Sequence, residues 1–318
     1  MKHSIKNAHI GLNTFNYGAT IQQLLIKDKN GNDVNVVLGF DKEEDYYDNP
    51  FYLGASIGRY AGRISQGGFS LNGDHFALHQ ENGVHLHGGK NGLNKKHWQL
   101  ESMEQDTDTP FITYSVTSPH LEEGYPGNLK VSVTYRLVGN RLEIAYEATT
   151  DKATVLNLTN HAYFNLEGKD SVLNHELKLS SKTFVELDKK LLPTGDFLFV
   201  KDSAYDFLNP EIIGNKPGFS GIDDVFVLNG EGLAAILYSP ETGIEMKVAT
   251  NQRAMVIYTP EDLGERNFVN GANYGNFSSI CFEAQTFPDA PNQPNFPSAV
   301  LQPGEVYSNK TILEFGIR

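Results

Sequence analysis

The sequence predicts an all-β fold, a large antiparallel β-sandwich, and three observations lead to this prediction. Apolar and polar residues alternate with a period of two over long stretches, which is typical of strands with one buried face. Thirty glycines and fourteen prolines supply frequent turns between short strands. No stretch longer than a turn or two has the 3.6-residue periodicity of an amphipathic helix.

The clearest elements are two strands within residues 129–148. Apolar residues from Leu129 to Leu137 alternate with polar ones, Gly139-Asn140 supplies a two-residue turn, and the alternation resumes from Leu142 to Ala148. This pattern predicts a β-hairpin with one buried and one solvated face. Asn-Gly pairs at 30–31, 72–73 and 229–230 mark further turns between apolar runs.

No charge block, low-complexity tract or linker divides the 318 residues, and no segment repeats. We therefore expect one domain spanning residues 1–318. An up-and-down barrel or a propeller is less favoured, because a propeller would show a blade-length repeat.

Composition excludes several classes of function. The net charge of −13, without a Lys/Arg cluster, argues against a nucleic-acid partner. The single cysteine, Cys281, excludes an internal disulfide framework and a cysteine-based zinc site. The N-terminus lacks the pattern of a signal peptide, and no apolar run could span a membrane. We expect a soluble cytoplasmic protein without a membrane partner; the sequence does not set its oligomeric state.

The stretch NLTNHAYFNL, residues 157–166, concentrates hydrogen-bonding side chains around one histidine. Read as a single strand, it places on one face Asn157, Thr159, His161, Tyr163 and Asn165. A solvated outer face is one interpretation. The other is a site for a hydroxyl-rich ligand, since this face carries donors and acceptors but none of the charged residues that solvated faces favour.

The stretch CFEAQTFPDAPNQPNF, residues 281–296, contains a lone carboxylate between apolar residues. As a strand it directs Cys281, Glu283 and Gln285 to one face. Taken alone, this pattern favours a surface position for Glu283 over a functional one, because acidic residues are seldom buried.

The stretch GVHLHGGKNGLNKKHW, residues 83–98, places His85 and His87 on one face if it is extended. A metal site would need a third ligand, and none is evident nearby. The glycines 88 and 89 indicate instead a sharp turn with His87 at a strand end. Walker, nucleophile-elbow and dinucleotide motifs are absent from the sequence.

Two further residues have both a structural and a functional interpretation. Arg63, in GRYAGRISQGG, could form a salt bridge or could bind hydroxyl oxygens through its guanidinium group. Asp223, in SGIDDVFVL, could shape a turn or could accept hydrogen bonds from hydroxyl groups.

Taken together, the chain resembles the aldose 1-epimerase (galactose mutarotase) family. The motifs that carry the resemblance occur in the family's order between Gly54 and Gly304: His-Gly-Gly at 87–89, GLNKKHW at 92–98, EGYPGNLKVSVTYRL at 123–137, NLTNHAYFNL, LLPTGDF at 191–197, GIDDVF at 221–226 and CFEAQTFPDAPNQP.

The resemblance implies a galactose mutarotase-like sandwich in which one sheet curves around a sugar site. It implies that Glu283 is the catalytic base and His161 the acid, that His87 assists at the sugar, and that Arg63 and Asp223 hold its hydroxyl groups. The implied reaction interconverts α- and β-anomers of a free aldose such as galactose or glucose. No redox step occurs, so we expect no cofactor and no metal, and a small sugar as the only partner.

Two departures from the family concern substrate contacts. Gly62 stands where the family often has asparagine, and Val256 stands where many members have a sugar-binding glutamine. The preferred sugar therefore stays open.

Three alternatives remain at this point. A glycoside hydrolase would use Asp223 and Glu283 as its two carboxylates. A hexose-phosphate 1-epimerase on the same fold should gather several basic residues on a phosphate, and only Arg63 lies near a motif. A carbohydrate-binding module would offer stacking aromatics, but the only tryptophan is Trp98.

Overall fold

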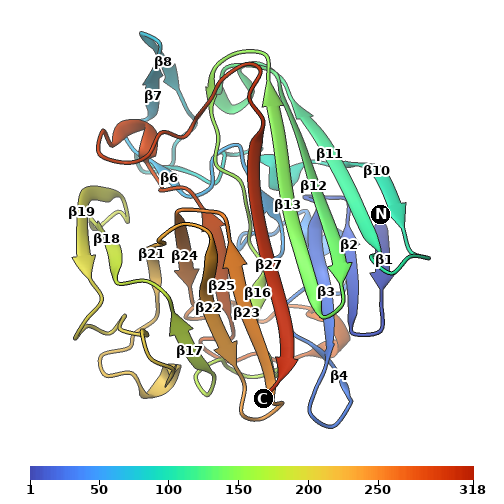
Figure 1. Ribbon diagram of the computed structural model, residues 1–318. Helices are drawn as coiled ribbons and strands as arrows, with labels where there is room; N and C mark the ends of the chain where they lie inside the picture. The colour runs from blue at the N-terminus through green and yellow to red at the C-terminus, as the bar shows by residue number, and fades with distance from the viewer.

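Strands and 3₁₀ turns make up the regular structure in the computed structural model, which describes residues 1–318 (Figure 1). The 3₁₀ turns are short: η1 (Glu43–Tyr46), η2 (Leu93–Lys95), η3 (Glu122–Gly124), η4 (Ile213–Asn215), η5 (Val269–Gly271) and η6 (Ala290–Asn292). No helical segment has the length and hydropathy that crossing a membrane requires. The predicted all-β class is confirmed.

The largest sheet has nine strands. In spatial order they are β10 (Gln99–Glu104), β11 (Phe111–Ser118), β12 (Leu129–Val138), β13 (Arg141–Thr150), β27 (Tyr307–Ile317), β23 (Ile244–Thr250), β22 (Gly232–Tyr238), β17 (Glu176–Leu179) and β20 (Glu211–Ile212). Strands β12 and β13 form the predicted hairpin around Gly139-Asn140, and their residues alternate between buried and more exposed positions as expected.

Two smaller sheets accompany the nine-stranded one. The six-stranded sheet runs in the order β16 (Tyr163–Phe164), β25 (Ile280–Gln285), β24 (Ala254–Tyr258), β21 (Asp223–Val227), β18 (Thr183–Leu187) and β19 (Pro193–Phe199). The four-stranded sheet consists of β1 (Lys2–Lys6), β2 (Ile10–Phe15), β3 (Thr20–Lys27) and β4 (Asp33–Asn35).

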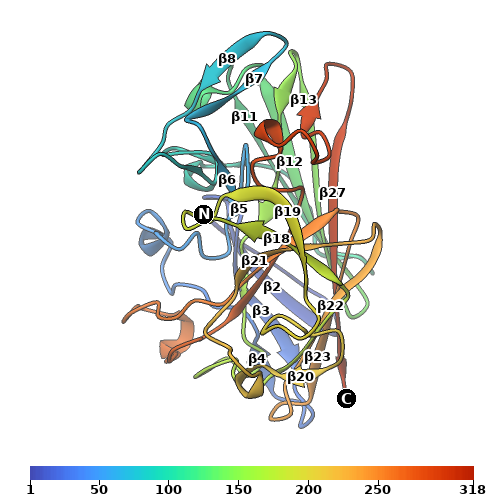
Figure 2. The same cartoon turned by 90° about the vertical axis from the view of Figure 1, so that its left-hand side faces the viewer.

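Short strand pairs complete the fold. They are β5 (Ser56–Ile57) with β15 (Thr159–Asn160), β6 (Arg63–Ile64) with β9 (His85–Leu86), β7 (Gly68–Leu71) with β8 (Asp74–Ala77), and β14 (Thr154–Val155) with β26 (Val300–Leu301). The β7–β8 hairpin, which turns at Asn72-Gly73 as predicted, projects from the top of the molecule in both views (Figures 1 and 2).

The main core lies between the layers and joins all three larger sheets. One apolar cluster contains Val133 of β12, Leu24 of β3, and Phe282 and Ala284 of β25. Because side chains alternate along a strand, the residues of β25 between these core positions face the opposite side of the six-stranded sheet. That outward side carries the candidate site.

The prediction of one continuous strand over residues 157–166 is wrong. The stretch contributes two short strands, β15 and β16, which pair with different partners, β5 and β25. Both pairings are short, and side chains at the two ends of the stretch also bind neighbouring backbone: the Asn157 amide donates to the Ala61 carbonyl oxygen at 2.9 Å, and the Asn165 amide donates to that of Ser278 at 2.7 Å.

Candidate functional site

All five residues to which the family resemblance assigns a role surround one cavity: Arg63, His87, His161, Asp223 and Glu283. The cavity volume is about 170 Å³. Distant parts of the chain supply these side chains, from β6, the end of β9, the turn between β15 and β16, β21 and β25.

Glu283 occupies the middle of β25 and is only 3% exposed. Its neighbours Phe282 and Ala284 enter the main core, so Glu283 and Cys281 share the opposite face of β25; Glu283 lines the cavity, and Cys281 is buried beside His161. The shared face of Cys281 and Glu283 agrees with the sequence pattern. The surface position that the pattern favoured for Glu283 is wrong, because neighbouring strands and the cavity walls cover the carboxylate.

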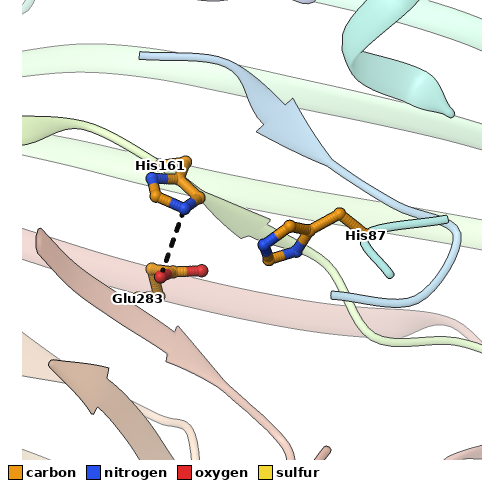
Figure 3. Close-up of side chains that lie close together, drawn as sticks. All are labelled: His87, His161 and Glu283. Carbon is orange, nitrogen blue, oxygen red and sulfur yellow. Dashed lines mark ion pairs between the residues drawn. The ribbon is translucent and has the colours of Figure 1, made fainter. Parts of the chain in front are cut away.

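His161 lies opposite Glu283, with 3.4 Å between His161 Nε2 and Glu283 Oε1 (Figure 3). Its backbone is fixed from both sides: its N–H donates to the Ala55 carbonyl oxygen and its own carbonyl accepts from the Gly54 N–H, both at 2.9 Å. The ring stacks on Tyr163 with a centroid separation of 5.0 Å. The two backbone hydrogen bonds and the contact with Tyr163 thus hold the His161 ring next to the carboxylate.

His87 follows β9 and approaches the pair from a third direction (Figure 3). The turn after it requires glycine, because a Cβ on Gly88 would lie 1.9 Å from the Gly58 carbonyl oxygen. The Gly62 N–H donates to His87 Nδ1 at 3.2 Å. Since a neutral imidazole has one N–H, its proton must be on Nε2, which makes His87 a hydrogen-bond donor through that atom.

His85 does not share the site with His87. It is fully buried, and its ring nitrogens contact the Tyr125 hydroxyl at 2.6 Å and the His79 carbonyl oxygen at 2.6 Å. The positive φ of His87 turns the chain between the two side chains. His85 therefore has a structural role.

The cluster of His87, His161 and Glu283 has the residue types of a metal site, and one potential ligand atom of each lies within 4.8 Å of the others. The hydrogen bond from Gly62 opposes that use. A metal-bound His87 Nε2 would place the ring proton on Nδ1, where it would meet the Gly62 N–H. The arrangement does not fit a metal ion.

Arg63 and Asp223 line the cavity as a pair, with 3.6 Å between Arg63 Nη2 and Asp223 Oδ2. Arg63 thus forms the salt bridge that was one interpretation of the sequence, and it also lines the cavity, as the other interpretation required. Strand β6 is anchored by Asp289 of the PDAPNQ segment, whose N–H donates to the Arg63 carbonyl oxygen at 2.7 Å and whose carboxylate accepts from the Ser65 N–H at 2.8 Å. Asp289 thus fixes the backbone of the strand that carries Arg63.

Burial favours the neutral forms of the central groups. It raises the pKa of Glu283 to about 8, with Asp223 adding to the rise and Arg63 opposing it. Burial lowers the pKa of His161 to about 4. The pKa of His87 is also well below its usual value, from burial first and His161 second. At neutral pH the Glu283–His161 pair of the free protein therefore holds one proton, on the carboxyl group.

Sequence reasoning missed two tyrosines of the site. Tyr52 lines the cavity and contacts His87 edge to face at a centroid separation of 4.7 Å, and Tyr258 lines it from β24. Nothing in the local sequence around Tyr52 marks it, since its loop reaches the site only in the folded chain. Tyr258 stands opposite Cys281 in the β24–β25 register, which the sequence does not reveal.

The polar face predicted for residues 157–166 lies at the site only in part. His161 and Tyr163 line the cavity, whereas Asn157, Thr159 and Asn165 are buried elsewhere. The asparagine side chains bind backbone carbonyl groups, so their polarity reflects structure and not a ligand surface.

The two departures from the family pattern, Gly62 and Val256, both line the cavity. Gly62 has a φ of +78°, and a Cβ there would lie 2.9 Å from Pro288 Cγ. An asparagine at this position would therefore require Pro288 to move.

Comparisons with known proteins concern the chain over nearly its whole length. The family model described as aldose 1-epimerase matches residues 1–314. A galactose mutarotase of Bos taurus is 36% identical over 326 residues, covering 99% of this chain and 94% of that protein.

Two solved structures are similar along the whole length. A GalM/aldose epimerase homologue from C. elegans has a TM-score of 0.92 at 29% identity and covers 100% of this chain and 99% of its own. A galactose 1-epimerase from Lactobacillus acidophilus NCFM has a TM-score of 0.87 at 28% identity, covering 99% and 93%. The fold is thus that of the galactose mutarotases.

Proposed function

This chain belongs to the aldose 1-epimerase family, and from that premise we propose which sugar it prefers and how its residues act. It is an aldose 1-epimerase, an isomerase that interconverts the α- and β-anomers of free aldoses. We propose galactose as the preferred sugar, because the similar proteins of Bos taurus and Lactobacillus acidophilus are named for it. We propose Glu283 and His161 as the proton-transfer pair, and the observation that carries this proposal is the 3.4 Å approach of the two side chains inside the cavity.

Anomer exchange needs one group that takes a proton and one that gives a proton. The C1 hydroxyl loses its proton, the C1–O5 bond breaks, and the ring oxygen gains a proton. The resulting aldehyde turns about the C1–C2 bond, and closure on the other face reverses both transfers. A pair that holds one proton meets this requirement, because one member is always ready to accept and the other to donate.

The sequence suggested a glutamate and a histidine near their ordinary pKa values, and burial changes this. In the free protein the shared proton is on Glu283. A bound sugar favours the other arrangement: its C1 hydroxyl donates to the ionised carboxylate, and its ring oxygen accepts from the protonated His161. Glu283 is then the base and His161 the acid, and their roles exchange on closure.

The remaining residues bind the sugar. His87 donates from Nε2 to a sugar oxygen, because Gly62 occupies its Nδ1. Arg63 donates to hydroxyl oxygens and Asp223 accepts from hydroxyl groups, so the pair can hold adjacent hydroxyl groups in one orientation. Trp98 is 1% exposed and donates to the Leu93 carbonyl oxygen, so it offers no stacking surface to a carbohydrate-binding module.

Polarimetry tests the proposed substrate. Freshly dissolved α-D-galactose and α-D-glucose are followed to anomeric equilibrium with and without the protein, and the spontaneous rate is subtracted. We expect a higher kcat/KM for galactose. A higher kcat/KM for glucose would reject the proposed preference, and no acceleration with either sugar would reject free hexoses as substrates.

The pH dependence of kcat/KM provides a further prediction. Above the Glu283 pKa of about 8 the free pair loses its only proton, and below the His161 pKa of about 4 it gains a second one. We expect kcat/KM to stay constant between these two pKa values and to fall about tenfold per pH unit outside them. A limb near the ordinary histidine pKa of about 6.5 would contradict the effect of burial on His161.

One observation favours a second candidate, a hexose-phosphate 1-epimerase. A neighbouring cavity shares Tyr52, Arg63 and Leu86 with the site and is also lined by three lysines, Lys90, Lys95 and Lys190. These lysines could bind a phosphate on the part of the sugar remote from C1.

This candidate predicts that galactose 6-phosphate competes at lower concentration than galactose does. It also predicts that Lys190→Gln removes the advantage, whereas Lys130→Gln, an exposed position on β12, keeps it. Equal or weaker competition by the phosphate in the wild type would reject the candidate and favour free galactose.

A further inference from the structure

The single cysteine contacts the catalytic histidine on the side away from the carboxylate. Cys281 Sγ lies 3.7 Å from His161 Nδ1, within hydrogen-bonding distance for sulfur. Cys281 is fully buried, and it is located two residues before Glu283 on the same face of β25. His161 therefore lies between two side chains of one strand, with one ring nitrogen toward each.

The two contacts together indicate which nitrogen of His161 carries the proton when the carboxyl group of Glu283 is protonated. When Glu283 is protonated, the nitrogen of His161 that faces it and can accept from its hydroxyl group is Nε2, which lies 3.4 Å from Oε1. The neutral ring must then carry its own proton on Nδ1, which points to the sulfur of Cys281. After the proton crosses to His161, Nδ1–H still points to the same sulfur.

We propose that Cys281 is a positioning residue for the epimerase reaction, whose sulfur accepts the His161 Nδ1–H and keeps the ring aligned while the proton moves between Glu283 and the imidazole. The inference rests on the proposed roles of Glu283 and His161. The sulfur takes the place that a carboxylate has in a Ser-His-Asp triad.

An uncharged sulfur at this position suits a reversible reaction better than a charged carboxylate would. A carboxylate at this position would stabilise the imidazolium and hold the proton on His161. The sulfur is a weak, uncharged acceptor, because burial raises the pKa of the Cys281 thiol well above its usual value. The ring is thus oriented without a strong bias toward either proton position, as suits a pair whose roles exchange.

Alanine and serine have side chains of nearly equal volume, so replacing Cys281 with each of them in turn separates this role from a packing role. We expect Cys281→Ala to lower kcat about tenfold or more, less than the 10⁴-fold effect of altering a charged orienting carboxylate, with KM little changed. Cys281→Ser should recover part of kcat, because its hydroxyl can accept from Nδ1. A packing role predicts the opposite order, since a buried hydroxyl replaces an apolar contact.

Nitrogen NMR of the His161 ring gives a readout independent of turnover, with His161→Gln used for assignment. We expect a protonated Nδ1 in the neutral wild-type ring and loss of that preference in Cys281→Ala. A wild-type ring protonated on Nε2, or an Ala variant with unchanged kcat, would overturn the proposal. If the protein lacks epimerase activity altogether, the NMR result still decides whether Cys281 sets the tautomer.

Discussion

Glu283→Gln should lose about 10²–10⁴-fold in kcat, the usual contribution of one positioned acid or base. The amide keeps the shape of the side chain but can neither take the C1 proton nor return it. Folding should be preserved, because the wild-type carboxyl group is itself neutral in the buried site below its pKa of about 8. Polarimetry on α-D-galactose measures the loss, and thermal unfolding verifies that the variant folds.

Glu147→Gln is the matched control, since Glu147 is exposed on β13 in the nine-stranded sheet. It should keep wild-type kcat. Because Glu283 and His161 act as a unit, the double variant Glu283→Gln/His161→Gln should be little worse than Glu283→Gln alone. A Glu283→Gln protein with more than about a tenth of wild-type kcat would be incompatible with its role as the base.

Arg59→Met should lower the free energy of unfolding by about 1–3 kcal/mol or more, since about 1–3 kcal/mol is the cost of leaving one buried acceptor without its donor. Arg59 is 2% exposed, and its guanidinium donates to the Ser118 side chain and to four carbonyl oxygens at distances from 2.6 to 3.0 Å. Methionine fills much of the same volume but leaves those buried acceptors without donors. Denaturant unfolding should show a lower midpoint.

Arg141→Met provides the comparison. The Arg141 side chain is 50% exposed and pairs with Glu314 on the surface of the nine-stranded sheet. Surface ion pairs contribute about 0–1 kcal/mol, so this variant should unfold close to the wild type. Equal destabilisation by the two substitutions would mean that the buried network around Arg59 adds little to stability.

Much of the fold could be predicted because period-2 alternation is a local property. The β12–β13 hairpin follows from its apolar alternation and its Gly139-Asn140 turn, and neither depends on distant residues. The stretch 157–166 could not be predicted in the same way. Its two halves pair with strands far apart in the chain, at Ser56–Ile57 and Ile280–Gln285, and long-range pairing leaves no mark in a local pattern.

The two arginines of GRYAGRISQGG, Arg59 and Arg63, have different roles that the local sequence cannot distinguish either. Arg63 reaches the cavity, whereas Arg59 is enclosed by backbone carbonyl groups of residues 118–127. Both side chains have the same chemistry and a similar glycine-rich context. Only the position of the segment relative to the β11–β12 connection decides which arginine binds and which stabilises.

The sequence by itself determined the strand-rich class and the hairpin, because residue type and local spacing carry that information. The five residues that surround the cavity followed from the resemblance to the aldose 1-epimerase family, since the local pattern around each of them also allowed a structural interpretation. Only the tertiary structure decided how these residues behave. Burial is a property of the whole chain, and it moves the pKa values of Glu283 and His161 in opposite directions. The same packing places Cys281 behind the imidazole and Gly62 beneath His87, and thereby sets which nitrogen of each ring carries a proton.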